Sequence, residues 1–153
     1  KHTESVYTAN GTKIANTMCS TGTPEYFLKP LEAQHGDLGL VKKQDVLLLI
    51  SNSGMTREIL ELIDQVTNLH GVMEIITITR NPDSPLAAAG HVNLFTGATV
   101  EICPLGMTPT TSTTVMTVLG DLLVVALMER IGFTKEQYGL RHHSGYLGRK
   151  ARD

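Results

Sequence analysis

Apolar and polar positions fall into blocks along the chain, and each block has the period of one kind of element. Val46 to Ile50 is an unbroken apolar run, which is typical of a strand buried on both faces of a parallel sheet. Shorter apolar runs predict further strands at Tyr26–Leu28, Ile75–Thr79 and Val92–Phe95, with a weak candidate at Glu4–Thr8.

Helical spacing separates these strands. Apolar residues from Ile59 to Leu69 recur every three or four positions, and Gly71 is suited to end that helix. The longest predicted helix, Thr111 to Arg130, is nearly apolar all round and is therefore expected to be central. Shorter helices are expected at Thr12–Ser20, Leu31–His35, after Ser84, and at Phe133–Leu140. This alternation indicates an α/β fold, a parallel sheet with helices on both faces.

A turn rich in hydroxyl groups, Ser51-Asn52-Ser53-Gly54, follows the central apolar run, and Thr56 opens the next helix. Hydroxyls and the free N–H groups of a helix N-terminus can bind an anion without a cation. In open parallel sheets, ligands bind beyond the carboxyl ends of the strands. The turn therefore predicts a phosphate site, although the same pattern also serves merely to cap a helix.

Composition narrows the class of protein. The 153 residues suit one domain, and 41% hydrophobic with 18% charged residues indicates a globular chain. A net charge of -2 argues against nucleic acid or an anionic membrane as the main partner. The longest wholly apolar run, Leu122 to Met128, is far shorter than the ~20 residues that span a bilayer.

The cysteine content and the start of the sequence indicate the cellular compartment of the protein. Cys19 and Cys103 form no disulfide framework, and both are expected to be small buried residues in a reducing compartment. No charged-then-apolar signal sequence opens the chain. The cytoplasm is the expected location.

The candidates for proton transfer are two carboxylates and three histidines: His35, Glu58, Glu101, His142 and His143. Histidine titrates near neutral pH and burial can raise a carboxylate pKa, so such a set can act as acid and base. The alternative interpretations are a helix-dipole carboxylate, a solvated loop carboxylate and surface histidines.

The sequence lacks the motifs of several common kinds of catalytic, metal-binding and nucleotide-binding site. The chain contains no HExxH, no cysteine pair, no serine elbow and neither glycine-rich nucleotide motif, so no metal and no cofactor are expected. A phosphate held by hydroxyls and helix-end amides suits a sugar phosphate better than a nucleoside triphosphate.

Several longer segments together resemble one family. They are LLLISNSGMTREI, EAQHGDLG, CSTGTP, CPLGMTPTTSTT, GFTKEQY and HHSGYLGR. From about Thr17 to Arg149 the chain resembles arabinose-5-phosphate isomerases, of the sugar isomerase (SIS) group of phosphosugar-binding domains. The resemblance implies a flavodoxin-like, three-layer αβα sandwich with about five strands, and a single such domain over residues 1–153.

The same resemblance implies an activity and an assembly. The family interconverts D-arabinose 5-phosphate and D-ribulose 5-phosphate through an enediol, the entry step to Kdo of lipopolysaccharide. Members are typically homotetramers whose active sites borrow the tail histidine from a neighbouring chain. A downstream activated sugar, CMP-Kdo, is a candidate feedback ligand for the same site.

Site residues carry over by motif position. The implied catalytic residues are His35, Glu58, Glu101 and His142. His143 stands where the family commonly has proline, which leaves open which of the two tail histidines acts. The implied substrate-binding residues are Ser51, Asn52, Ser53 and Thr56, with Ser20, Thr110, Thr111, Ser112, Thr113 and His143 nearby.

The chain departs from the family at its start. A first strand ending in G-x-G-K is not recognisable, so the N-terminal part is expected to be incomplete. Lys13 lies too close to Cys19-Ser20-Thr21-Gly22 to stand for the family's active-site lysine. The regulatory CBS modules that often follow are also missing, which indicates a stand-alone domain. Two alternatives remain: a non-catalytic phosphosugar sensor, and an isomerase of another phosphosugar.

Overall fold

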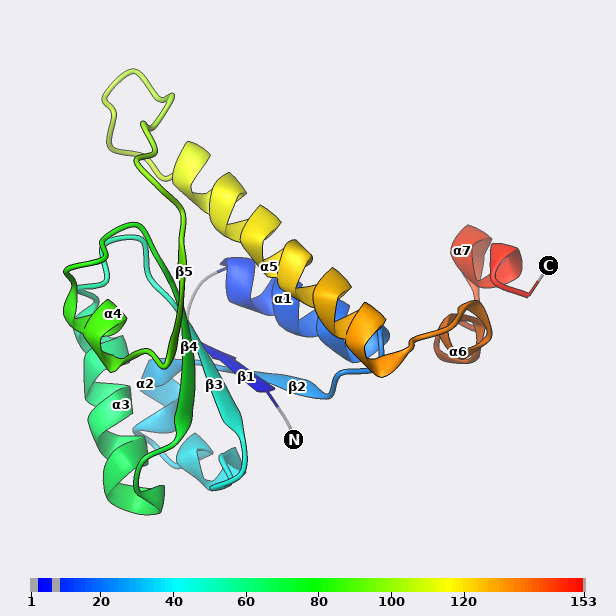
Figure 1. The fold of residues 1–153 in the computed structure, drawn as a ribbon, viewed down its shortest axis with the longest axis horizontal. Coiled ribbons are helices and arrows are strands. Elements are labelled where there is room, and N and C mark those ends of the chain that lie inside the picture. Colours follow the sequence, from blue (N-terminus) through cyan, green and yellow to red (C-terminus); the bar gives the residue numbers. More distant parts are fainter. Residues whose placement is uncertain (1–2, 7–8, 153) are drawn as a thin grey trace.

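The computed structural model describes residues 3–6 and 9–152, and its centre is a parallel sheet (Figure 1). The five strands are ordered β2-β1-β3-β4-β5, and every neighbouring pair is parallel. This is the flavodoxin-like order, so the predicted α/β class and parallel sheet are confirmed. The strands are β1 (Thr3–Val6), β2 (Glu25–Leu28), β3 (Val46–Ile50), β4 (Glu74–Thr79) and β5 (Val92–Phe95).

Helices cover both faces of this sheet and make it the middle of three layers (Figure 1). Side chains of β3 explain why: Leu48 and Ile50 pack on one face, whereas Leu47 and Leu49 pack on the other. The helices are α1 (Ala9–Ser20), α2 (Pro30–Ala33), α3 (Arg57–His70), α4 (Pro85–Ala89), α5 (Thr111–Ile131), α6 (Lys135–Arg141) and α7 (Gly145–Lys150), with a 3₁₀ turn at Asp37–Leu40.

Two core clusters keep the layers together. Ile14 and Met18 of α1 and Met116 and Val124 of α5 meet the first face of the sheet. The second face is covered by α2, α3 and α4, through Ala33, Ile59, Leu62, Val66 and Leu86. Each burial removes apolar surface from water, which is the main term that stabilises such a fold.

The first strand differs from expectation. Residues Thr3–Val6 pair in parallel with both β2 and β3, so this weakly predicted segment is an inner strand of the sheet. A polar segment can hold this position because its backbone bonds to strands on both sides. Of the weak candidate at Glu4–Thr8, Tyr7 and Thr8 lie outside the described residues, and α1 starts at Ala9 rather than Thr12.

Two other expectations need correction. Helix α5 is not central, because Val118, Leu122 and Val125 are 52%, 60% and 51% exposed on the side away from the sheet. It is also the one described helix long and apolar enough to span a membrane by length and composition. The tail forms α7, a helix that the sequence pattern did not predict. Cys19 is exposed and Cys103 half-buried, because neither side chain points into a core cluster.

Helices α1 and α5 approach closely at one glycine. A Cβ on Gly120 would lie 2.2 Å from Cδ1 of Ile14, so only glycine leaves room for that side chain. Next to this contact, Lys13 forms an ion pair with Asp121. Lys13 therefore faces α5 and not the carboxyl edge of the sheet.

This contact yields a stability prediction. Gly120→Ala should overpack the interface at a cost of about 1–3 kcal/mol, offset in part by the higher helix propensity of alanine, about 1 kcal/mol. We expect a net loss of unfolding free energy, measured by urea denaturation. Ile14→Val removes the Cδ1 methyl and should relieve part of the clash, so the double variant should lose less than the sum of the two single losses. Strict additivity would contradict this packing account.

Candidate functional site

The loop that follows β3 folds its hydroxyl groups around its own backbone. Ser51 Oγ accepts a hydrogen bond from the Gly54 N–H at 3.1 Å and lies 2.7 Å from Thr56 Oγ1. Ser53 Oγ accepts one from the Met55 N–H at 3.1 Å. Since Thr56 is the residue before α3, these hydroxyls stand at the N-terminus of that helix. We call residues 51–56 the cradle.

The cradle is fixed against the loop after β4. The Arg80 N–H donates to the Asn52 carbonyl at 3.0 Å, and the Leu86 N–H donates to the Gly54 carbonyl at 3.2 Å. Gly54 has a φ of +67°, and a Cβ there would lie 2.1 Å from Oγ of Ser84, the residue that caps α4. No other residue fits this turn without moving one of the two loops.

Glu101 lies at the N-terminus of α5. Its Oε2 accepts hydrogen bonds from the Thr110 N–H at 2.7 Å, the Thr110 hydroxyl at 2.8 Å and the Ser112 N–H at 3.4 Å. Hydrogen bonds from the Ser112 side chain and from Thr110 lower the Glu101 pKa to about 2. The carboxylate therefore stays ionised at neutral pH and occupies donors that the start of a helix offers to an anion.

A cavity of about 300 Å³ joins the cradle to Glu101. The predicted residues that line it are Ser51, Asn52, Ser53, Thr56, Glu101, Ser112 and Thr113. Two segments far apart in sequence thus meet at the carboxyl edge of the sheet, which is where parallel sheets bind ligands. Thr110 takes part through its hydrogen bonds to Glu101, while Thr111 is the first residue of α5 and does not line the cavity.

Three other predicted residues do not line this cavity. Ser20 ends α1 and donates its hydroxyl to the Thr17 carbonyl at 2.9 Å. His35 is exposed in the loop after α2, and Glu58 is half-buried in the first turn of α3, just past the cradle. Of the four predicted catalytic side chains, the described residues bring only Glu101 to the cavity.

The tail histidines lie far from the cavity. Helices α6 and α7 form an arm beyond the C-terminal end of α5, whereas Glu101 is at its N-terminal end (Figure 1). Helix α5 has 21 residues, and at ~1.5 Å per residue it separates the two by roughly 30 Å. His142 stacks on Tyr138 with ring centroids 3.8 Å apart, and its Nδ1–H donates to the Tyr138 carbonyl. His142 is half-buried and His143 is exposed on the same arm.

Part of the lining of the cavity between the cradle and Glu101 was not predicted from the sequence. Apolar lining also comes from Met107, Pro109 and Met116. Met116 lies in α5, whose nearly all-apolar pattern does not single it out, and Met107 and Pro109 lie in the segment C-P-L-G-M-T-P, which has neither helical nor strand periodicity. Cys103 shapes this segment, because its Sγ accepts hydrogen bonds from the Thr108 and Met107 N–H groups. These bonds, from Thr108 above all, lower the Cys103 pKa to about 7, so the thiol is partly ionised at neutral pH.

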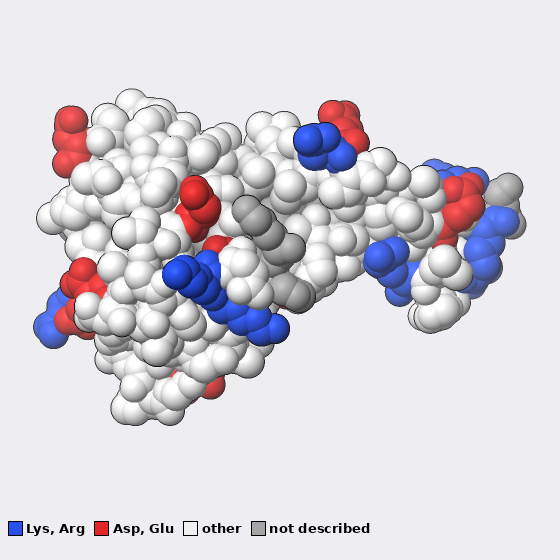
Figure 2. Space-filling view, turned by 60° about the horizontal axis from the view of Figure 1, so that its bottom comes forward, with Lys and Arg blue, Asp and Glu red and all other residues white. Residues whose placement is uncertain are grey.

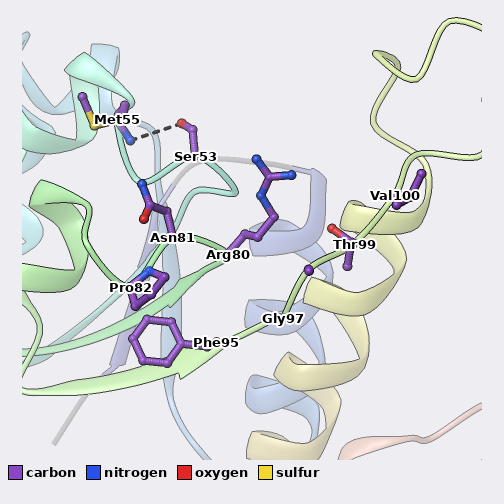
Figure 3. Close-up of a pocket in the computed structure, with 10 residues that line it drawn as sticks. Ser53, Met55, Arg80, Asn81, Pro82, Phe95, Gly97, Thr99 and Val100 are labelled. Atoms are coloured by element: carbon purple, nitrogen blue, oxygen red, sulfur yellow. Dashed lines mark hydrogen bonds between the residues drawn. The ribbon is translucent and has the colours of Figure 1, made fainter.

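A second hollow, of about 770 Å³, borders the cradle at Ser53 (Figure 3). Arg80 and Asn81 from the loop after β4 line one side of it, and Phe95 and Thr99 come from β5 and the segment that follows. Within the described ranges, 3–6 and 9–152, no three His, Cys, Asp or Glu side chains gather as a metal site requires.

Comparison with known proteins gives a consistent picture. The SIS domain family matches residues 6–126. The chain is 50% identical over 140 residues to the arabinose 5-phosphate isomerase KdsD of Pseudomonas aeruginosa, and the match covers 92% of this chain. It spans only 42% of that relative, so well under half of the longer protein is represented.

Solved structures agree with this match. A putative phosphosugar isomerase involved in capsule formation from Bacteroides fragilis is 57% identical with a TM-score of 0.90. The likeness covers 95% of this chain and 78% of that one. An Escherichia coli CFT073 protein in complex with arabinose 5-phosphate is 39% identical, with a TM-score of 0.83 over 92% of this chain and 74% of that one.

The hydrogen bonds to Glu101 predict a pH dependence at the start of α5. The Glu101 pKa is lowered on folding, so its contribution is present above the ordinary carboxyl pKa and is lost as pH falls toward about 2. Hydrogen exchange of the first amides of α5 should therefore be faster, relative to the intrinsic rate, at pH 3 than at pH 7. Glu101→Gln should show weaker protection at pH 7 and less change with pH. Identical protection in the two proteins would contradict the capping role.

Proposed function

This chain belongs to the SIS domain family, and from that membership we propose that it is a sugar phosphate isomerase that interconverts D-arabinose 5-phosphate and D-ribulose 5-phosphate. The observation that carries the proposal is the cavity that joins a hydroxyl-lined cradle to an ionised carboxylate. The cradle suits the phosphate group, and the carboxylate suits a proton transfer at the sugar carbons. The 50% identity to KdsD isomerases supports the choice of this sugar.

The reaction needs one proton to move between two carbons. A base takes the proton from C2 of the aldose, and the electron pair forms the C1–C2 double bond of the enediol as the carbonyl oxygen is protonated. A proton is then delivered to C1, while the O2 hydroxyl loses its proton and becomes the ketone. Glu101 and Glu58 are the proposed acid–base pair, and His35 and His142 are the proposed groups that polarise the two oxygens.

We further propose that the site is completed by a second copy of the chain, in a homotetramer. Val118, Leu122 and Val125 form an exposed apolar stripe at helical spacing along α5, which is the pattern of a helix-packing seam. The arm is basic, with Lys135, Arg141, Arg149, Lys150 and Arg152 against Glu136, and it stands clear of the body (Figures 1 and 2). An arm so placed can carry His142 into the cavity of a neighbour but not into its own.

The wider role follows the resemblance. We propose the cytoplasm as the location and the first step of Kdo synthesis, for lipopolysaccharide or capsule, as the pathway. CMP-Kdo, the proposed feedback ligand, would compete for the same cavity, and competitive inhibition of the isomerase assay tests this. A non-catalytic phosphosugar sensor and an isomerase of another phosphosugar are the alternatives, which a panel of pentose and hexulose phosphates separates.

The activity itself is the first test. The purified protein should form ribulose 5-phosphate from arabinose 5-phosphate between pH 6 and 9, and Glu58→Gln should lower turnover by roughly 10²–10⁴, as expected for an acid–base residue. Glu61→Gln is the matched control, since Glu61 lies one turn further along α3 and pairs with Arg57 on the surface. Binding of the sugar phosphate without turnover would favour the sensor, and equal effects of the two changes would remove Glu58 from the chemistry.

Sharing of the site is tested by complementation. Glu58→Gln and His142→Asn should each be nearly inactive alone. When the two variants are co-expressed with different tags and the mixed assemblies are purified, some cavities regain both native side chains, so activity should return. His143→Asn in place of His142→Asn identifies the acting histidine. Mixed assemblies that stay inactive would rule out a histidine supplied by another chain.

A further inference from the structure

The charge around the cavity is unfavourable for a phosphate group. A sugar phosphate carries up to two negative charges near neutral pH. Among the described residues that line the cavity, the charged side chain is the Glu101 carboxylate, and the donors are neutral hydroxyls and amides. A phosphate in the cradle would meet a negative charge of the same cavity, and repulsion between like charges weakens binding.

A cation lies directly beyond the cradle. Arg80 lines the second hollow, whose wall includes Ser53 of the cradle (Figure 3). The side chain of Arg80 extends alongside Ser53, on the same side of the strands as the Ser53 hydroxyl (Figure 3). The two residues therefore face a common space at the carboxyl edge of the sheet.

The backbone of Arg80 is held in place by the cradle itself. Its N–H donates to the Asn52 carbonyl at 3.0 Å, and the Thr79 hydroxyl donates to the same carbonyl at 3.3 Å. The position from which the side chain starts is thus fixed relative to Ser53. A site whose backbone is preorganised in this way loses less entropy when a ligand binds.

The guanidinium group of Arg80 is available to bind a ligand. The ion pairs of the described residues are Lys13 with Asp121 and Arg57 with Glu61, and neither involves Arg80. The residue is exposed, so its head is accessible from solvent. Thr99, on the facing side of the hollow, has a buried hydroxyl without a hydrogen-bond partner in the described part of the chain.

We propose that Arg80 is the cation that binds the ligand's phosphate group where it meets Ser53, and so offsets the charge of Glu101. Its planar fork can donate two hydrogen bonds to phosphate oxygens while the cradle holds the others. Arg80 is then a binding residue that selects phosphorylated sugars and takes no part in the proton transfer. The inference rests on the proposed function only in taking a phosphate ester as the ligand.

The test measures binding separately from activity. Calorimetry with inorganic phosphate and with arabinose 5-phosphate should show Arg80→Gln weakening the affinity by roughly 10- to 100-fold, as for a lost hydrogen bond to a charged group. Arg80→Lys should fall between the unaltered protein and Arg80→Gln, because it keeps the charge but not the fork. Since the fixing bond uses the backbone N–H, both variants keep it.

A matched control removes the same charge nearby. Arg57 directly follows the cradle as the first residue of α3, and its side chain is 85% exposed and paired with Glu61. Arg57→Gln should therefore change the affinity little. If the protein turns over, Arg80→Gln should raise KM with little change in kcat, because the phosphate is bound equally in the ground and transition states.

Three results would overturn the inference. They are an unchanged phosphate affinity in Arg80→Gln, an equal loss in Arg57→Gln, or no phosphate binding by the unaltered protein. Phosphate binding that depends on Arg80, in a protein without turnover, would uphold the inference while refuting the isomerase proposal. Full turnover with an Arg80-independent affinity would do the reverse.

Discussion

The parallel pairing of β3 with β1 and β4 is the constraint on which the rest of this molecule depends. Parallel strands end at the same edge, so the loop after β3 and the loop after β4 are delivered side by side. The hydrogen bonds from Arg80 to Asn52 and from Leu86 to Gly54 then tie the loops together. A cradle without this support would be a flexible hydroxyl-rich turn, and ordering it would cost free energy at each binding event.

Charges and dipoles at the same edge of the sheet give different environments to the start of α5 and to the cradle. The start of α5 is already occupied by the Glu101 carboxylate, so its amide dipoles stabilise that charge first. Under the proposed function, a ligand phosphate is therefore directed to the β3 side, toward the cradle. The same bonds keep Glu101 ionised at neutral pH and lower its strength as a base. The proposed phosphate binding and the proposed proton transfer thus lie on different sides of one cavity.

The arm and α5 relate the cavity to the proposed assembly of several chains. The buried side of α5 packs on α1 and the sheet, with Gly120 allowing the closest contact, while the opposite side leaves valines and a leucine in water. The N-terminal end of α5 helps to build the cavity, and the C-terminal end carries the arm away from it (Figure 1). Helix α5 therefore contributes to the cavity at its N-terminal end, and its length determines how far the arm lies from the cavity of the same chain.

Local pattern determined much of this protein. The run Val46–Ile50 predicts its strand to the residue, because five consecutive apolar side chains demand burial on both faces. Ser84 with Pro85, and Gly71 and Gly132, mark helix ends, because capping chemistry is local. The cradle at Ser51–Thr56 follows from the same kind of signal.

Only the tertiary structure decided how distant groups meet. Glu101 comes to the cradle because α5 crosses back over the sheet, and the polar segment Thr3–Val6 is a strand because it has neighbours on both sides. The exposure of α5 likewise depends on what packs against it, which a nearly all-apolar helix does not encode. Arg80 had no motif of its own, and its place beside Ser53 comes from the register of β3 with β4. Helix caps and strand burial depend on residues close together in the sequence, so the sequence pattern predicts them. Contacts between residues on different strands and helices depend on long-range packing, which the pattern does not encode.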